Sequence, residues 1–324
     1  MKMELTRAVF KTLKDCARLK PGESVLILAD TLADYEIVTK FGEVAHALGA
    51  EVSVMVYEAR EEVDIEPPRP VAAALSNADL VVDLVTKYII HTDSYLRARK
   101  NGVRILCGTG ITQDMLIRMV GQVDYSIILE SAKRVKDMFD TSRRCEIRTK
   151  EEHLLTMKLG DRPVLIRDGV LEGAGDLDYI PGAQVSLAPL EETIEGSIVV
   201  NGTIYPPIGR LNKNIILRFK EGKLINIEGG SEADIFRRWL KSFNDPKMYY
   251  VAHISIGLNP KARISGNILE DERIAGAFVL GLGSQMEYFK GNIGKASAHS
   301  DSVVLGANVL LDGKYLVRDG RLES

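Results

Sequence analysis

Two short segments of this chain carry residues that could bind a metal ion. His299 and Asp301 stand two residues apart, just before the apolar run Val303–Leu305. In an extended strand, residues i and i+2 point to the same side, so the imidazole and the carboxylate are expected to project together. His253 lies in a second strand-like segment, Tyr250–Ile256. Two histidines and one carboxylate are the ligand set of a non-haem Fe(II) facial triad, which leaves coordination positions open for substrate and oxygen.

The spacing alone does not single out a metal site, because a His-x-Asp pair can equally be a surface pair or a hydrogen bond in the core. The chain has five histidines and three cysteines in all, so few other side chains could supply this chemistry. The remaining histidines are predicted to have no chemical role: His46, His91 and His153. The cysteines are odd in number and form no C-x-x-C pair, so a disulfide framework or a thiolate zinc site is not expected. They are predicted to be small buried residues: Cys16, Cys107 and Cys145.

Composition and charge narrow the class of protein. The chain has 324 residues with 42 basic and 45 acidic side chains, a net charge of −3, and so no excess of positive charge that would favour nucleic acid. Hydrophobic residues make up 45% and charged residues 27%, as in ordinary folded proteins. No apolar run approaches the roughly 18 residues of a membrane span, and the first 13 residues do not look like a signal peptide. A soluble protein of a reducing compartment, the cytoplasm, is expected.

The first 140 residues alternate strand and helix signals. Short apolar runs typical of buried strands are Ser24–Ala29, Glu51–Tyr57, Asp79–Val85 and Val103–Cys107. Helical patterns separate and follow them: Thr31–Ala50, Val71–Asn77, Ser94–Gly102, Asp114–Val120 and Ser131–Phe139. Such alternation predicts an α/β domain over residues 1–140, with a doubly wound, mostly parallel sheet.

The pattern changes after about Thr141. X-Gly pairs between apolar segments are hairpin signals, because the turn needs positive φ. Five such pairs occur: Asp168-Gly169, Asn201-Gly202, Glu221-Gly222, Asp312-Gly313 and Asp319-Gly320. One helix is predicted over Ser231–Phe243. Residues 141–324 are therefore predicted to form a β-rich α+β domain, as a twisted sheet or an open barrel, that carries the metal-binding residues.

Several segments of the second half resemble the 2,5-dihydroxypyridine 5,6-dioxygenase family, which is related to the M29 (leucyl aminopeptidase T-like) metallopeptidases. The segments that carry the resemblance are Gly229–Asp234, Phe243–Tyr249, His253–Ala262, His299–Asp301 and Asn308–Gly313. The likeness is strongest from about Gly182 to Gly313 and lies at the level of pattern in the first 140 residues.

The resemblance also separates the two branches of this group. The peptidases resemble one another in two Gly-Glu motifs, a separate histidine and a His-x-Asp, which hold two metal ions. In this chain Gln184 takes the place of the first glutamate and His253 that of the second, and no histidine occurs between His253 and His299. An amide cannot supply the anionic charge of a carboxylate ligand. The set that remains, His253, His299 and Asp301, fits the one-metal site of the dioxygenase branch.

The resemblance implies an Fe(II)-dependent, extradiol-like ring-cleaving dioxygenase that takes O₂ and a hydroxylated N-heteroaromatic such as 2,5-dihydroxypyridine, with N-formylmaleamate as product. It also implies a homo-oligomer. Glu287 and Gln184 are predicted as further catalytic residues, although a solvated surface glutamate explains Glu287 equally well. The family has a pocket histidine where this chain has Thr156, with His153 three residues away.

Two other classes of protein remain open. An M29-type metallo-aminopeptidase would use a metal-activated water and needs more carboxylate ligands than this assignment places. The acidic run Glu270–Glu272 could supply them, or could be an ordinary charged loop. The third possibility is a non-catalytic relative without a metal.

Overall fold

The structure is a computed structural model that describes residues 2–150 and 153–323. The chain divides into two compact units. The first comprises the residues up to Tyr125 together with Arg167–Gly182, and the second comprises Ser126–Ile166 and the residues from Ala183 onward. The units interleave along the chain, and the division into domains 1–140 and 141–324 stays a prediction.

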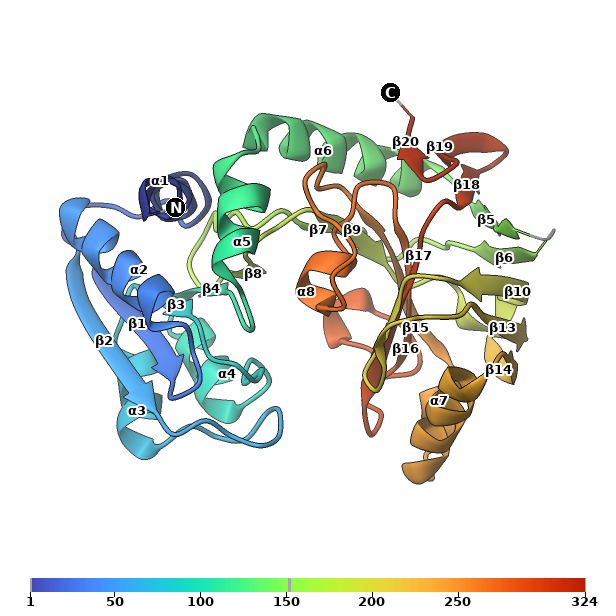
Figure 1. Cartoon of the computed structure of the whole chain (residues 1–324), viewed down its shortest axis with the longest axis horizontal. Helices are drawn as coiled ribbons and strands as arrows, with labels where there is room; N and C mark the ends of the chain where they lie inside the picture. The colour runs from blue at the N-terminus through green and yellow to red at the C-terminus, as the bar shows by residue number, and fades with distance from the viewer. Residues whose placement is uncertain (1, 151–152, 324) are drawn as a thin grey trace. The chain divides into compact units, whose positions relative to one another are not determined.

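The first unit is built on one parallel sheet with the strand order β2-β1-β3-β4-β8 (Figure 1). Its strands are β1 (Ser24–Asp30), β2 (Glu51–Tyr57), β3 (Leu80–Asp83), β4 (Arg104–Cys107) and β8 (Leu177–Tyr179). Every ladder in it is parallel. The predicted α/β class with a parallel sheet is confirmed. The edge strand β8 was not predicted, because it is three residues long and lies 70 residues beyond β4 in the chain.

Helices and short helical turns cover this sheet. They are α1 (Lys2–Lys11), η1 (Thr12–Cys16), α2 (Tyr35–Ala47), α3 (Arg69–Leu75), α4 (Asp93–Lys100), α5 (Gln113–Met115) and η2 (Leu116–Gly121). Leu26 and Leu28 of β1 belong to a core cluster shared with α3 and α4. The alternate residue Ile27, which points to the other face, is also fully buried. Both faces of β1 are therefore covered, which explains why it reads as a continuous apolar run.

The second unit contains two separate sheets, in which adjacent strands pair antiparallel. The eight-stranded sheet has the order β14-β13-β10-β6-β5-β18-β19-β20. Its strands are β5 (Arg144–Arg148), β6 (Leu154–Lys158), β10 (Glu195–Val200), β13 (Ile215–Lys220), β14 (Lys223–Glu228), β18 (Asn308–Leu311), β19 (Lys314–Arg318) and β20 (Arg321–Leu322). The predicted β-rich α+β class is confirmed, with its strands arranged in two sheets.

The seven-stranded sheet of this unit has the order β12-β11-β17-β16-β15-β9-β7. Its strands are β7 (Leu165–Arg167), β9 (Gln184–Leu187), β11 (Thr203–Tyr205), β12 (Gly209–Arg210), β15 (Val251–Gly257), β16 (Phe278–Gly283) and β17 (His299–Val304). The helices and helical turns of the unit are α6 (Tyr125–Thr141), η4 (Glu191–Thr193), α7 (Ser231–Ser242), η5 (Pro246–Tyr249), α8 (Ile268–Asp271) and η6 (Glu287–Phe289). The predicted helix over Ser231–Phe243 is therefore confirmed as α7.

Three of the five predicted X-Gly hairpins are confirmed. Glu221-Gly222, Asp312-Gly313 and Asp319-Gly320 each have positive φ at both positions and join adjacent antiparallel strands. The prediction was wrong at Asn201-Gly202 and Asp168-Gly169, because each connects strands that belong to different sheets. A turn-forming pair indicates a change of direction, but it does not determine which strand comes next in a sheet.

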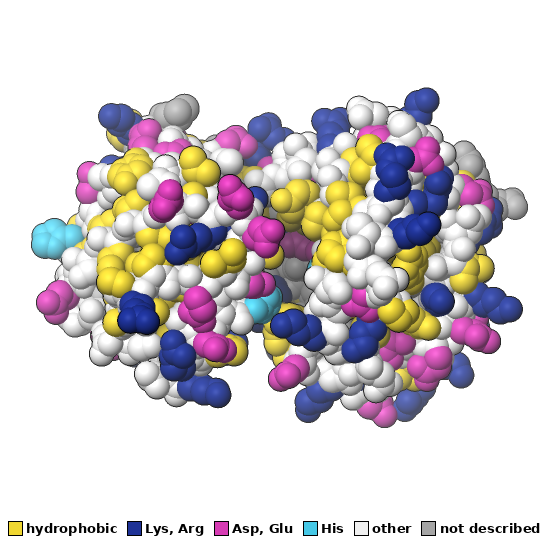
Figure 2. All heavy atoms as spheres, turned by 90° about the horizontal axis from the view of Figure 1, so that it is seen from below, with side chains coloured by type: hydrophobic (Ala, Val, Ile, Leu, Met, Phe, Trp, Pro, Cys, Tyr) yellow, Lys and Arg dark blue, Asp and Glu magenta, His cyan; other side chains and the backbone are white. Residues whose placement is uncertain are grey.

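Other general predictions also have a structural counterpart. All three cysteines are free and buried, as predicted. Burial raises the pKa of the Cys16 thiol to about 12. None of the helices in the described part of the chain has the length and apolar character needed to cross a bilayer. On the face drawn in Figure 2, basic and acidic side chains are interspersed rather than gathered by sign.

Candidate metal centre

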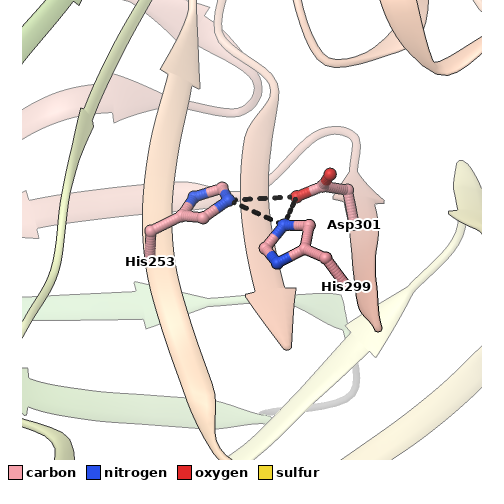
Figure 3. A group of neighbouring side chains, drawn as sticks. All are labelled: His253, His299 and Asp301. Atoms are coloured by element: carbon pink, nitrogen blue, oxygen red, sulfur yellow. Dashed lines mark hydrogen bonds and ion pairs between the residues drawn. The ribbon is translucent and has the colours of Figure 1, made fainter. Parts of the chain in front are cut away.

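The candidate ligands lie on β15 and β17, the two strands that flank β16 in the seven-stranded sheet. The register pairs His253 of β15 with Gly281 of β16, and Gly281 with Asp301 of β17. Residues directly opposite one another in antiparallel strands share a face of the sheet. His299 lies two residues before Asp301 and therefore points to the same face. Figure 3 shows the three side chains converging from β15 and β17.

The three ligand atoms form a nearly equilateral triangle. The Nε2 atom of His253 lies 3.1 Å from Nε2 of His299 and 3.2 Å from Oδ1 of Asp301 (Figure 3). The Nε2 atom of His299 also lies 3.2 Å from Oδ1 of Asp301. The structure therefore brings together all three residues predicted as metal ligands. Within residues 2–150 and 153–323, they are the one group of three or more His, Cys, Asp or Glu side chains placed to share an ion.

The hydrogen bonds behind the histidines determine which ring nitrogens carry protons. Nδ1 of His299 lies 2.8 Å from the carbonyl oxygen of Ser284, which can only accept, so this nitrogen donates. Nδ1 of His253 lies 3.2 Å from Oγ of Ser255, whose hydroxyl donates to Oγ of Ser186 at 2.9 Å. Ser255 therefore accepts from His253. In the neutral tautomers both Nε2 atoms present lone pairs to Asp301, as metal-ligating histidines do.

This donor set fits a bound divalent ion. Two lone pairs and a carboxylate oxygen at 3.1–3.2 Å repel one another unless a positive charge lies among them. Three ligands at about 2.1 Å on one face of an octahedral ion lie about 3.0 Å from one another. The observed spacing matches that arrangement. The ligands also come from rigid strands of a sheet, which favours a preorganised site.

The electrostatics of the cluster show the same need for a cation. Burial alone would lower the pKa of His299, but the neighbouring Asp301 carboxylate outweighs burial and leaves the pKa above its usual value. Burial alone would raise the pKa of Asp301, but His299 and His253 hold it well below the usual range. Asp301 thus makes His299 hold its proton more strongly than an ordinary histidine does when no metal ion is present.

Glycine at position 281 leaves room for the ring of His253. A Cβ atom at Gly281 would lie 2.4 Å from Nε2 of His253 and under 3.0 Å from two further ring atoms. On another side, the ring of Phe289 stacks on His253 with centroids 5.4 Å apart and planes 11° apart. The imidazole of His253 therefore has little freedom to turn away from Asp301.

The other predicted catalytic residues are not among the three ligands of this triangle. Gln184 pairs with Gly257, four residues along β15 from His253, which corresponds to about 13 Å. Its side chain is buried and donates to Glu272 at 3.2 Å. Glu287 is exposed on η6. Their catalytic roles stay predictions.

The resemblance implies a pocket histidine near Thr156 and His153, and neither residue lies in the sheet of the candidate ligands. His153 lies 2.7 Å from Oγ of Ser197, a residue of the eight-stranded sheet. Thr156 pairs with Glu146 and Glu195 in that same sheet. Thr156 therefore belongs to a different sheet from the three candidate ligands, and His153 directly precedes its strand.

The acidic run Glu270–Glu272 is not an exposed loop. Glu270 and Asp271 are almost fully buried in α8. Glu270 accepts from the backbone N–H of Arg263, and Asp271 accepts from the backbone of Ser265. These carboxylates therefore hold the neighbouring loop.

Sequence reasoning missed the residues that support the ligands. Ser255 could have been found, because it is two residues from His253 and must point to the same face. The Ser284 carbonyl has no sequence signal, since every residue has one. Gly281 and Phe289 become informative only when the strand register is known.

Loss of the Ser255 hydroxyl is expected to weaken metal binding without altering the fold. Ser255→Ala leaves the Nδ1–H of His253 without its acceptor, and such outer contacts contribute about 10–100-fold to metal affinity. Ser197→Ala is the matched control, because it removes the serine contact of His153 instead. Anaerobic Co(II) titrations compare the two variants, and equal affinities would contradict this role for Ser255.

Metal affinity is also expected to depend on pH. Because the pKa of His299 is raised, an incoming ion must displace a proton, and affinity should rise about tenfold per pH unit below that pKa and level off above it. The linkage has the opposite sign for the apoprotein. The raised pKa contributes stability that is present below the unfolded histidine value and is lost as pH rises through the folded value. Co(II) titrations and thermal melts across the pH range between the unfolded and folded pKa values of His299 measure the two pH dependences, of metal affinity and of apoprotein stability. A metal affinity that does not change with pH would contradict the role of His299 as a ligand.

Comparisons with known proteins define first a class. A solved structure described as 2,5-dihydroxypyridine dioxygenase from Pseudomonas putida KT2440 matches with a TM-score of 0.84 and 24% identity, over 100% of this chain and 98% of that one. Wild-type AmpT from Thermus thermophilus matches with a TM-score of 0.69 and 15% identity over 100% of both chains. At these identities the two matches establish the fold, which this chain shares with both proteins.

The sequence comparisons then identify the family. The 2,5-dihydroxypyridine 5,6-dioxygenase family matches residues 4–324. The 2,5-dihydroxypyridine 5,6-dioxygenase of Pseudomonas putida is 29% identical over 258 residues, which cover 76% of this chain and 71% of that protein. The chain belongs to the 2,5-dihydroxypyridine 5,6-dioxygenase family, as the resemblance indicated.

Proposed function

We propose that this protein is an Fe(II)-dependent dioxygenase that cleaves the ring of a hydroxylated N-heteroaromatic such as 2,5-dihydroxypyridine. The observation that carries the proposal is the triangle of His253, His299 and Asp301, with ligand atoms 3.1–3.2 Å apart, in a chain of this family. A ferrous ion held by two neutral imidazoles and one carboxylate would supply open positions for the substrate oxygen and for O₂.

In the proposed mechanism the protein holds the metal ion, orients the two histidine rings and sets the charge of the site. Ser255 and the Ser284 carbonyl keep the Nδ1 protons of the two histidines on the far side of the rings, so that both Nε2 atoms stay available. Asp301 would contribute one negative charge to a bound ferrous ion, so the site would keep a net charge of about +1 and would favour a substrate hydroxyl that has lost its proton.

The exposure of the ligands suggests the side from which substrate approaches. The side chain of His253 is 12% exposed and that of Asp301 16%, whereas that of His299 is 31% exposed. Phe289 stacks on the ring of His253. We therefore place the aromatic substrate on the side of His299, with Phe289 shielding His253 from water. Glu287 remains the proposed group that orients a ligand or takes the substrate proton.

Both atoms of O₂ enter the proposed product, so the reaction needs no external reductant. For 2,5-dihydroxypyridine the proposed product is N-formylmaleamate, formed by breaking the ring bond between carbons 5 and 6. The proposal includes a homo-oligomer and a cytoplasmic location, where free buried cysteines are usual.

An oxygen-uptake assay tests this function. Anaerobically purified protein is reconstituted with Fe(II) and given 2,5-dihydroxypyridine and a panel of hydroxylated rings. Iron-dependent uptake with one O₂ consumed per ring, lost after chelation and restored by Fe(II), is expected. The alternative M29 activity is examined in the same preparation with Zn²⁺ or Co²⁺ and peptide substrates. Peptide cleavage without oxygen uptake would overturn the proposal in favour of that alternative.

A further inference from the structure

A loop outside the triangle contacts both candidate histidine ligands. This loop, residues 284–298, joins β16 to β17 and is called the histidine-facing loop below. Its first residue, Ser284, accepts from Nδ1 of His299 through its carbonyl oxygen. Phe289, in the middle of the loop, stacks on His253. The position of one loop therefore affects the orientation of both rings.

The side chain of Gln285 connects the histidine-facing loop to strand β15. Nε2 of this buried side chain donates to the carbonyl oxygen of Ala252, at 2.7 Å, and Ala252 directly precedes His253. Its Oε1 accepts from the backbone N–H of Ile293 at 3.2 Å. The loop closes tightly over this amide, because a Cβ atom at Gly291 would lie 2.0 Å from Oε1 of Gln285. Gln285 thus fixes both the loop and the strand that carries His253.

Glu191 binds both Gln285 and the backbone of the histidine-facing loop. One of its oxygens accepts from Gln285 at 3.2 Å and from the backbone N–H of Asn292 at 2.9 Å. Arg162 binds the two oxygens of the carboxylate at 2.7 and 2.8 Å. The Glu191 and Arg162 side chains are only 7% and 11% exposed. The two parallel hydrogen bonds of this ion pair fix the orientation of the Glu191 carboxylate. Removing one partner would leave the charge of the other buried and uncompensated.

We propose that Glu191, held by Arg162, is a positioning residue for the metal centre, because it fixes the histidine-facing loop and through it both histidines. The inference rests on the proposed metal-binding function of His253, His299 and Asp301. The contacts of Glu191 run to Arg162, Gln285 and the backbone of Asn292. Its influence on the ligands is therefore transmitted through Gln285 and the loop backbone.

The first variant to test is Glu191→Gln, which keeps the size of the side chain and removes its charge. Anaerobic Co(II) titrations, followed by visible absorption, report both affinity and ligand geometry at the site. A loss of affinity of about 10–100-fold is expected, the range found for groups that orient metal ligands. Glu23→Gln is the matched control, because it breaks another largely buried ion pair, that of Glu23 with Arg104 at 2.7 Å in the first unit. This control is expected to bind Co(II) like the unaltered protein.

A second variant separates positioning from general stability. The double variant Arg162→Met with Glu191→Leu removes the ion pair without leaving a lone buried charge, so its thermal stability should recover relative to Glu191→Gln. Its Co(II) affinity should stay low, because leucine offers no oxygen to accept from Gln285 and from the backbone N–H of Asn292. Affinity that recovers together with stability would overturn the proposal and leave Glu191 a purely structural residue.

Unaltered Co(II) affinity and spectrum in Glu191→Gln would equally overturn it. A different result is expected if the three residues do not bind a metal ion at all. The unaltered protein would then show no stoichiometric Co(II) binding that depends on His299.

Discussion

His299→Ala is expected to abolish oxygen uptake with 2,5-dihydroxypyridine and to remove tight metal binding. The loss should be on the order of 1000-fold, equivalent to about 4 kcal/mol of transition-state stabilisation. His299 supplies one corner of a triangle whose other corners lie 3.1 and 3.2 Å away, so two ligands cannot hold the ion in the same place. Anaerobic metal titration and oxygen-electrode assays measure the two effects.

The fold should survive this substitution. The side chain of His299 is 31% exposed, and the backbone pairing of β17 with β16 does not depend on it. His153→Ala is the matched control, since it removes a histidine that also contacts a serine but lies directly before β6, a strand of the other sheet of the second unit. A folded His299→Ala variant that kept its activity and its metal would show that the centre lies elsewhere.

Gly281→Ala is expected to have an effect nearly as large, although it changes no ligand. The added Cβ would lie 2.4 Å from Nε2 of His253, and the clash is with a ring that Phe289 also confines. The backbone at Gly281 is not in the left-handed region, so alanine introduces no backbone strain there. Metal affinity should fall by at least about 100-fold, because His253 must turn away from Asp301.

Gly230→Ala is a suitable control for that experiment. It also lies in the second unit, has negative φ, and its added Cβ would meet no atom nearer than 3.8 Å. It should bind metal like the unaltered protein, as measured by Co(II) titration. Undiminished binding in Gly281→Ala would show that His253 reaches the centre by another path, and the proposed role of the glycine would be wrong.

The parts of the site that follow from local periodicity could be predicted from the sequence. The i, i+2 rule was sufficient to place His299 and Asp301 on one face of a strand. His253 joined them through family resemblance, since nothing local specifies that β15 and β17 flank β16. Gly281 carries no local sequence signal of its own. Its steric role depends on cross-strand register, which one sequence does not contain.

The fold shows the same division between local and long-range information. Buried parallel strands and the amphipathic helix α7 were predictable because their patterns are local. The edge strand β8 and the turns at Asp168-Gly169 and Asn201-Gly202 depend on which sheet the chain enters next. Likewise the acidic run Glu270–Glu272 was compatible with metal ligands or with an ordinary charged loop, but Glu270 and Asp271 accept from backbone donors of the loop before α8.

The proposed function depends above all on one metal ion held by His253, His299 and Asp301. Anomalous diffraction at the iron absorption edge, from crystals grown anaerobically with Fe(II), locates such an ion independently of any assay. We expect one strong peak per chain, about 2.0–2.3 Å from Nε2 of each histidine and from a carboxylate oxygen of Asp301. Two peaks per chain, as in a two-metal peptidase, or a single peak away from these residues would contradict the assignment.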